Sequence, residues 1–165
     1  MKMRKISIGE LLSKQFKKGE FQRYDIIAKY LFINAFMADG CKDDFTFDLY
    51  SDMAKARGRR GKRKSFIKMI RSFLKDGFLS EYPLIVKKNY YMCGGSHRLA
   101  CCMWFDINKI PMVFHEGSKK KKDLFSMGWL NNNGLGKYFE LLEKNKVILF
   151  EKFKVNEYNQ YKKVV

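Results

Sequence analysis

In the stretch Cys93-Gly94-Gly95-Ser96-His97-Arg98-Leu99-Ala100, two glycines are followed by the start of a helix-like run. Paired glycines allow the backbone to turn tightly and to approach a ligand closely. We expect Ser96 to cap the helix, which places His97 and Arg98 in its first turn. Backbone N–H groups at a helix start, together with histidine and arginine donors, make a site for an anion such as phosphate. The stretch therefore predicts an anion site where a strand gives way to a helix.

The segments before this stretch contain three predicted helices. The clearest covers residues 65–76, where apolar residues recur every three or four positions, and Gly77 stands where a left-handed cap belongs. Another covers residues 23–36 and ends at Asp39-Gly40. The third begins at a cap formed by Asp43 or Asp44 and runs to about residue 57.

Short apolar runs predict the strands of a small sheet. Residues 5–8 alternate apolar and polar side chains, and residues 84–86 are followed by a turn and a hairpin partner at 90–92. A last strand covers residues 110–114, after a helix that runs from Ser96 to about residue 105. Together, the predicted helices and strands indicate an α+β domain in which a small mixed β-sheet is flanked by helices.

The C-terminal part of the chain is expected to be helical. Residues 123–131 predict one helix, an asparagine-rich turn breaks it, and residues 136–155 predict a longer one before a frayed end. We therefore expect a core over residues 1–115 with an inserted helical and basic-loop segment at about 37–64. Residues 116–165 would form a helical extension packed on the same domain.

Composition points to a single basic domain with anionic partners. The 165 residues suffice for one hydrophobic core, and 34 lysines and arginines against 17 acidic residues give a net charge of +17. Such a charge favours nucleic acid, nucleotides or an anionic surface. The four cysteines have no zinc-site spacing, and no long apolar stretch predicts a signal peptide or a membrane span. These features are typical of a cytoplasmic protein with reduced thiols and no metal site.

The segment at residues 57–64 is strongly basic. It reads RGRRGKRK, so six of its eight residues are cationic, and its two glycines predict a flexible loop. It is either a solvated run of charge or an arm that follows the phosphates of a nucleic acid. Under the second interpretation the nucleic-acid-binding residues are Arg57, Arg59, Arg60, Lys62, Arg63 and Lys64. The four lysines at 119–122 are either a solvated run of charge or a segment that attracts an acidic polymer or an anionic surface.

The order of these pieces resembles the ParB/sulfiredoxin superfamily over about residues 3–115. The matching segments are the first strand, the amphipathic helix that ends at Gly77, the strand after Pro83, and the Gly-Ser-His-Arg turn with its following helix and strand. The resemblance implies a cradle for nucleotide phosphates, with ATP or CTP as ligand and Mg²⁺ as companion ion. Its residues here would be Gly94, Gly95, Ser96, His97 and Arg98.

Two departures from the superfamily pattern bear on chemistry. Kinase-like members carry an aspartate where this chain has Gly94, and sulfiredoxins carry their reactive cysteine where it has Ser96. The resemblance also implies an acidic residue early in the first long helix, which Asp25 matches. As catalytic residues, Asp25 would accept a hydroxyl proton and His97 would stabilise developing negative charge. Glu10 is an alternative acid, and both acids have an ordinary interpretation as helix-dipole partners.

Three functions follow from these observations. The first is an ATP-dependent phosphotransferase that acts on a small hydroxyl-bearing acceptor. The second is a DNA-binding module of the ParB kind, and the third is an inactive nucleotide-binding partner. The sequence decides neither the acceptor nor the oligomeric state. His115 and Glu116 are too few to define a metal site.

Overall fold

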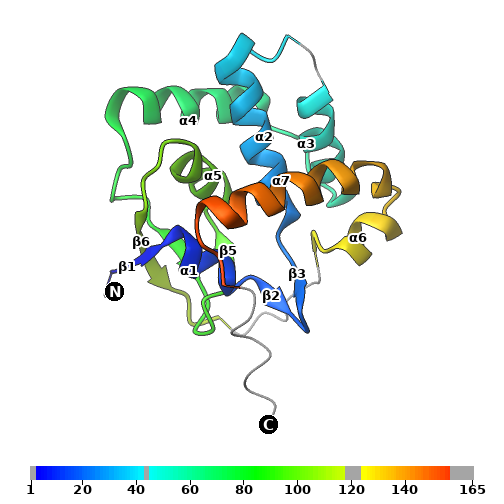
Figure 1. Cartoon of the computed structure of the whole chain (residues 1–165). Helices are drawn as coiled ribbons and strands as arrows, with labels where there is room; N and C mark the ends of the chain where they lie inside the picture. The colour runs from blue at the N-terminus through cyan, green and yellow to red at the C-terminus, as the bar shows by residue number, and fades with distance from the viewer. Residues whose placement is uncertain (1–2, 43–44, 118–123, 157–165) are drawn as a thin grey trace.

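The computed structural model of the chain describes residues 3–42, 45–117 and 124–156. Within them, a four-stranded sheet lies beside a group of helices (Figure 1). The strand order is β1 (Arg4–Ser7), β6 (Lys109–Phe114), β4 (Leu84–Val86) and β5 (Met92–Gly94). β6 is antiparallel to β1 and parallel to β4, and β4 forms a hairpin with β5. The predicted α+β class with a small mixed sheet is confirmed.

Helix α2 (Tyr24–Asp39) is the centre of the helical part. It packs against α3 (Phe45–Ala56), α5 (Ser96–Trp104) and α7 (Phe139–Lys152), and Figure 1 shows α7 crossing it. Its side chains are buried on more than one side, so its N-terminal half is almost wholly enclosed. The predicted helix is confirmed and ends at Gly40, whose φ of 74° is left-handed.

The N-terminal segment differs from its prediction at Ile8. The hydroxyl of Ser7 accepts the backbone N–H of Glu10 at 3.2 Å and caps α1 (Ile8–Ser13), so Ile8 begins a helix instead of ending a strand. A hairpin of β2 (Phe16–Lys17) and β3 (Glu20–Phe21) follows. Strands of two residues each leave no periodic pattern, and the hairpin was not predicted.

Helix α4 (Arg63–Asp76) confirms the amphipathic helix but starts earlier than predicted. Arg63 and Lys64 belong to it, so the basic loop comprises residues 57–62. Gly77 follows with a positive φ of 68°, as its position predicted, but its ψ of −154° is not that of the expected left-handed cap. The proposed caps of α3, Asp43 and Asp44, lie outside the described residues.

The hairpin partner of β4 is shifted from its predicted position. Tyr90 has a φ of 64° and donates its N–H to the Lys87 carbonyl at 2.8 Å, so residues 90 and 91 complete the turn. β5 therefore begins at Met92 and includes Cys93 and Gly94. The side-chain amide of Gln15 lies along this strand: it donates to the Tyr90 carbonyl at 3.0 Å and accepts the Met92 N–H at 3.1 Å.

The C-terminal segment packs into the same core. After α6 (Met127–Asn132) and the 3₁₀ turn η1 (Gly136–Tyr138), α7 places the Phe150 ring 5.0 Å from that of Phe21. The predicted lysine run at 119–122 and the frayed end after residue 156 lie outside the described residues, as does Asp123. None of the helices in the described ranges is long and apolar enough to cross a bilayer.

All four cysteines are free thiols. Cys41, Cys101 and Cys102 are buried, whereas Cys93 is exposed at the edge of the sheet. Burial raises the pKa of the Cys101 thiol to about 12, so this group stays protonated and unreactive.

Candidate functional site

The glycine pair brings β5 into the start of α5. Gly95 has a φ of 91°, and a Cβ there would lie 2.6 Å from Leu84 Cδ2. A Cβ at Gly94 would make only ordinary contact with Ile85, at 3.6 Å. Gly95 is therefore the position where the turn demands glycine. The expectation that Ser96 caps α5 is wrong: Gly95 is the N-cap residue, no side chain caps the helix, and Ser96 is its first residue.

Ser96 instead contacts a buried chain of charges from the start of α2. Its Oγ lies 2.6 Å from Lys29 Nζ, which lies 3.0 Å from Asp25 Oδ2. Arg23 holds the same carboxylate with both arms of its guanidinium, at 2.8 and 2.9 Å, and its Nη1 donates to the Met92 carbonyl. The chain Arg23–Asp25–Lys29–Ser96, which we call the charge chain, thus ties α2 to β5 and α5.

Burial and pairing oppose each other in the charge chain. Burial alone would raise the pKa of Asp25, but the charges and hydrogen bonds of Arg23 and Lys29 outweigh it, and the pKa lies well below its usual range. Burial lowers the pKa of Lys29 despite its contact with Asp25, with Arg23 and Arg57 adding repulsion. The network contains two cations and one anion, so its net charge is positive.

Asp25 lies where the superfamily resemblance predicted an acidic residue. Only 3% of it is exposed, and both of its oxygens accept hydrogen bonds from cations. A carboxylate whose pKa is lowered in this way is a weak proton acceptor. Its observed contacts position Arg23 and Lys29.

His97 is held as a neutral ring. Its Nε2 lies 2.8 Å from the Tyr50 hydroxyl, and the Phe66 ring meets it edge-on with centroids 4.7 Å apart. Burial, followed by repulsion from Lys29, lowers the pKa of His97 to about 3. At neutral pH the imidazole therefore carries no charge, and it offers one N–H donor and one acceptor.

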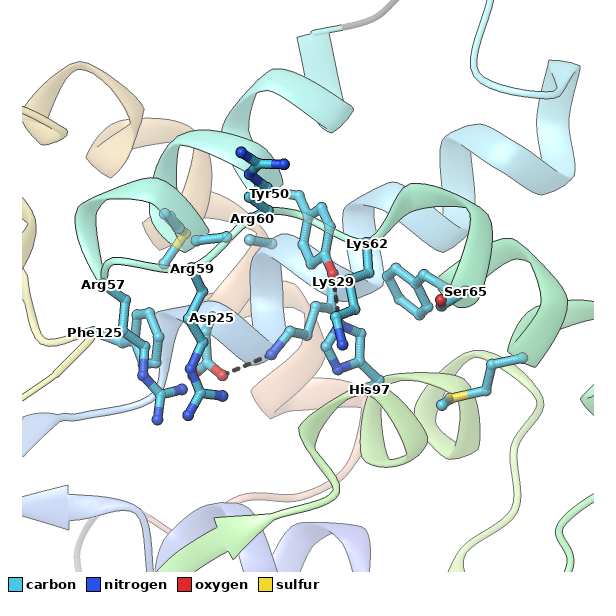
Figure 2. Close-up of a pocket in the computed structure, with 15 residues that line it drawn as sticks. Asp25, Lys29, Tyr50, Arg57, Arg59, Arg60, Lys62, Ser65, His97 and Phe125 are labelled. Carbon is cyan, nitrogen blue, oxygen red and sulfur yellow. Dashed lines mark hydrogen bonds and ion pairs between the residues drawn. The ribbon is translucent and has the colours of Figure 1, made fainter.

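These side chains line a pocket of about 610 Å³ between α2, α3, α4 and α5 (Figure 2). The lining combines apolar and basic side chains, and Lys29 and His97 form part of it. The basic loop supplies Arg57, Arg59, Arg60 and Lys62. The apolar lining residues are Ala28, Met53, Ala54, Phe66, Met69 and Phe125.

The arginines of the basic loop do not all point the same way. Figure 2 shows the guanidiniums of Arg57 and Arg59 side by side near Asp25, whereas Arg60 points away. Arg57 packs over the Phe125 ring at 5.5 Å. Burial, then repulsion from Arg59, lowers the pKa of Arg57. Two adjacent guanidiniums without a carboxylate partner among the described residues are a favourable place for an anion.

Arg98 is separated from the rest of the predicted cradle. Its Nη1 donates to the carbonyls of Tyr82 and Pro83 at 2.9 and 3.2 Å, and its guanidinium packs over the Tyr82 ring. It lines a second hollow of about 320 Å³ and does not line the first pocket.

The other acidic and histidine candidates lie away from the pocket. Glu10 is exposed in the first turn of α1, where an acidic side chain complements the helix dipole. His115 accepts the Gly117 N–H at 2.7 Å. Among the described residues no cluster of three or more potential metal ligands occurs.

Sequence reasoning missed Arg23, Lys29, Tyr50 and Phe125. The spacing of Asp25 and Lys29, one helical turn apart, was a local signal for their ion pair. Tyr50 reaches His97 across 47 positions, and no local pattern announces such a contact.

Comparisons of the chain with models of known protein families, with curated proteins and with solved structures found no match. The pocket and its charges therefore carry the functional interpretation.

Proposed function

We propose that the protein binds a nucleotide through its phosphate groups in the pocket between α2 and α5. The observation that carries this proposal is the pair Arg57 and Arg59 beside the charge chain. Two exposed guanidiniums and the Lys29 ammonium line one hollow, which the first turn of α5 reaches through His97. These three cations favour an anion, and their charge exceeds that of Asp25, the carboxylate that lines the pocket among the described residues.

The pocket has room for more than a phosphate. Its volume of about 610 Å³ is in the usual range for small-molecule sites. We assign the phosphates to the side formed by Arg57, Arg59 and the α5 start, and the base and sugar to the apolar wall of Phe66, Met69 and their neighbours. Either ATP or CTP, as the ParB/sulfiredoxin resemblance implies, is compatible with this division.

Binding is better supported than phosphoryl transfer. Transfer to a hydroxyl acceptor needs a group that takes up its proton, and among the described residues Asp25 is the carboxylate that lines the pocket. Its pKa is lowered, and its oxygens are occupied by Arg23 and Lys29. Magnesium would be carried by the phosphate oxygens themselves, because it keeps several waters and needs few protein ligands.

The test compares two arginines of one loop. Isothermal calorimetry with ATP, CTP and inorganic tripolyphosphate, each with and without magnesium, measures affinity for wild type, Arg59→Gln and Arg60→Gln. We expect Arg59→Gln to weaken nucleotide binding about tenfold, as loss of one charge-assisted hydrogen bond does. Arg60 also lines the pocket, but its guanidinium points away from Asp25, so Arg60→Gln, which removes the same charge, should change the affinity less than threefold.

Two results would overturn the proposal. One is the absence of binding by any of the three ligands, and the other is equal affinity of the Arg59→Gln and Arg60→Gln proteins. If tripolyphosphate binds tightly and neither nucleotide binds more tightly than it does, the ligand is a polyphosphate and not a nucleotide.

A further inference from the structure

Helix α4 carries a continuous cationic stripe outside the pocket. Lys64, Lys68, Arg71 and Lys75 are spaced by four, three and four positions, and all are exposed. This spacing places them on one face of the helix, over about 16 Å at the usual rise per residue. None of them forms an ion pair with a carboxylate in the described part of the chain.

The opposite face of α4 is committed to the core. Phe66, Ile70 and Phe73 are buried there, and Figure 1 shows the helix at the periphery of the molecule. The helix cannot turn this apolar face toward a lipid bilayer without unfolding the domain. The stripe is therefore a rigid row of charge on a folded surface, which suits a polyanion better than a membrane.

An aromatic groove adjoins the stripe. The second hollow, of about 320 Å³, lies between α4 and residues 77–82, and Lys68 of the stripe is part of its wall. Phe73 and Phe78 line it, and Tyr82, which is 54% exposed, stands at its side with Arg98 over the ring. Two carbonyl contacts hold Arg98 in this position.

We propose that α4 and this groove bind single-stranded nucleic acid, independently of the nucleotide pocket. The phosphates lie along Lys64, Lys68, Arg71 and Lys75, and a base stacks in the groove beside Tyr82. A row of cations next to an aromatic platform is the arrangement by which proteins hold single strands without reading sequence. A duplex would satisfy the stripe, but its paired bases could not enter the groove.

The test removes equal charge from two places. One variant changes Lys64, Lys68, Arg71 and Lys75 to Gln, and its control changes Lys5, Lys18, Lys88 and Lys144, four exposed lysines of other elements, to Gln. Both variants lower the net charge by four. Fluorescence anisotropy with a labelled oligothymidine measures affinity between 50 and 200 mM salt, and circular dichroism confirms the fold.

We expect the stripe variant to bind at least tenfold more weakly than the control. The slope of log affinity against log salt should fall by about 3, because each phosphate contact on a single strand contributes about 0.7. Tyr82→Ala should weaken binding about tenfold through lost stacking, while Tyr82→Phe, which keeps the ring, should bind as wild type does.

Four results would overturn the proposal. The wild type could fail to bind oligothymidine at the lowest salt, or the two charge variants could bind it equally. A duplex of the same length could bind more tightly than the single strand, with no effect of Tyr82→Ala. Anionic phospholipid vesicles could bind with the same dependence on the stripe, which would assign this face to membranes.

Discussion

The ammonium of Lys29 lies 2.6 Å from the hydroxyl of Ser96, although 67 positions separate them in the chain. This contact joins Lys29, in the second turn of α2, to the first residue of α5. It explains why the glycine turn and the long helix before it form one site. Because Lys29 also contacts Asp25, a substitution in the charge chain is expected to alter the position of Lys29 in the pocket.

Replacement of Asp25 should destabilise the fold. In Asp25→Ala, Arg23 and Lys29 remain buried without a counter-charge, and breaking a buried pair in this way costs about 3–5 kcal/mol. Urea unfolding measures the loss. Glu81→Gln, which neutralises an exposed carboxylate, serves as the control and should cost less than about 0.5 kcal/mol. A fully stable Asp25→Ala protein would show that the charge chain does not hold the helices together.

His97 should make stability depend on pH. Its pKa is about 3 in the folded protein, against the ordinary 6.5, so the unfolded chain takes up a proton that the folded chain refuses. The stabilisation is complete above pH 6.5 and falls toward pH 3, by up to about 1.4 kcal/mol per pH unit. Urea unfolding at pH 7, 6, 5 and 4 measures this slope. His97→Gln should flatten the slope between pH 6 and 5, and a slope unchanged by this substitution would contradict the assignment.

The exposed histidine provides the control for this prediction. His115 lies on the surface and accepts one backbone N–H from Gly117. His115→Gln removes an imidazole without touching the pocket, and it serves as the matched substitution for His97→Gln. Asp25, with its lowered pKa, adds a loss of stability below about pH 5, where the unfolded carboxylate begins to protonate.

The two glycines should tolerate alanine very differently. Gly95→Ala puts a side chain at a φ of 91° and 2.6 Å from Leu84, so we expect a loss of about 2–4 kcal/mol. Gly94→Ala meets only ordinary contacts and should cost less than about 1 kcal/mol. Thermal denaturation of the two variants checks the difference. Similar losses at both positions would mean that the turn relaxes to accept a Cβ.

Tyr50 should keep the basic loop in place. Its hydroxyl contacts His97 and interacts electrostatically with the backbone of Lys62, and its ring lies against Gly61, so it joins α5 to the end of residues 57–62. Tyr50→Phe should cost about 1 kcal/mol and speed hydrogen exchange in that loop. Exchange in α7, which does not contact this hydroxyl, provides the internal reference. Unchanged exchange in the loop would show that other contacts position it.

The sequence predicted those parts of the fold that local patterns determine. Periodicity located α2 and α4, and the glycine pair located the tight turn before α5. The starting residue of β5 could not be predicted from the sequence, because it depends on Tyr90 adopting a left-handed conformation that its residue type does not favour.

The site was predicted only in part, because its contacts depend on the packing of distant segments as well as on local patterns. Ser96 and His97 do face the region of Asp25, but Arg98 turns to carbonyls of residues 82 and 83 on the other side of α5. Neighbours in a helix point in different directions, so one motif can serve two hollows. The pairing of Lys29 with Ser96 depends on how α2 packs against α5, which no local pattern encodes.

The side-chain amide of Gln15 affects whether the β5 edge of the sheet can pair with a strand of another chain. It donates to the Tyr90 carbonyl and accepts the Met92 N–H, while Arg23 donates to the Met92 carbonyl. β5 is the last strand of the sheet, and these side chains occupy the backbone groups that a strand from another chain would use. Two buried side chains thus take the hydrogen-bonding place of a neighbouring strand, and they protect this edge against intermolecular β-sheet growth and aggregation.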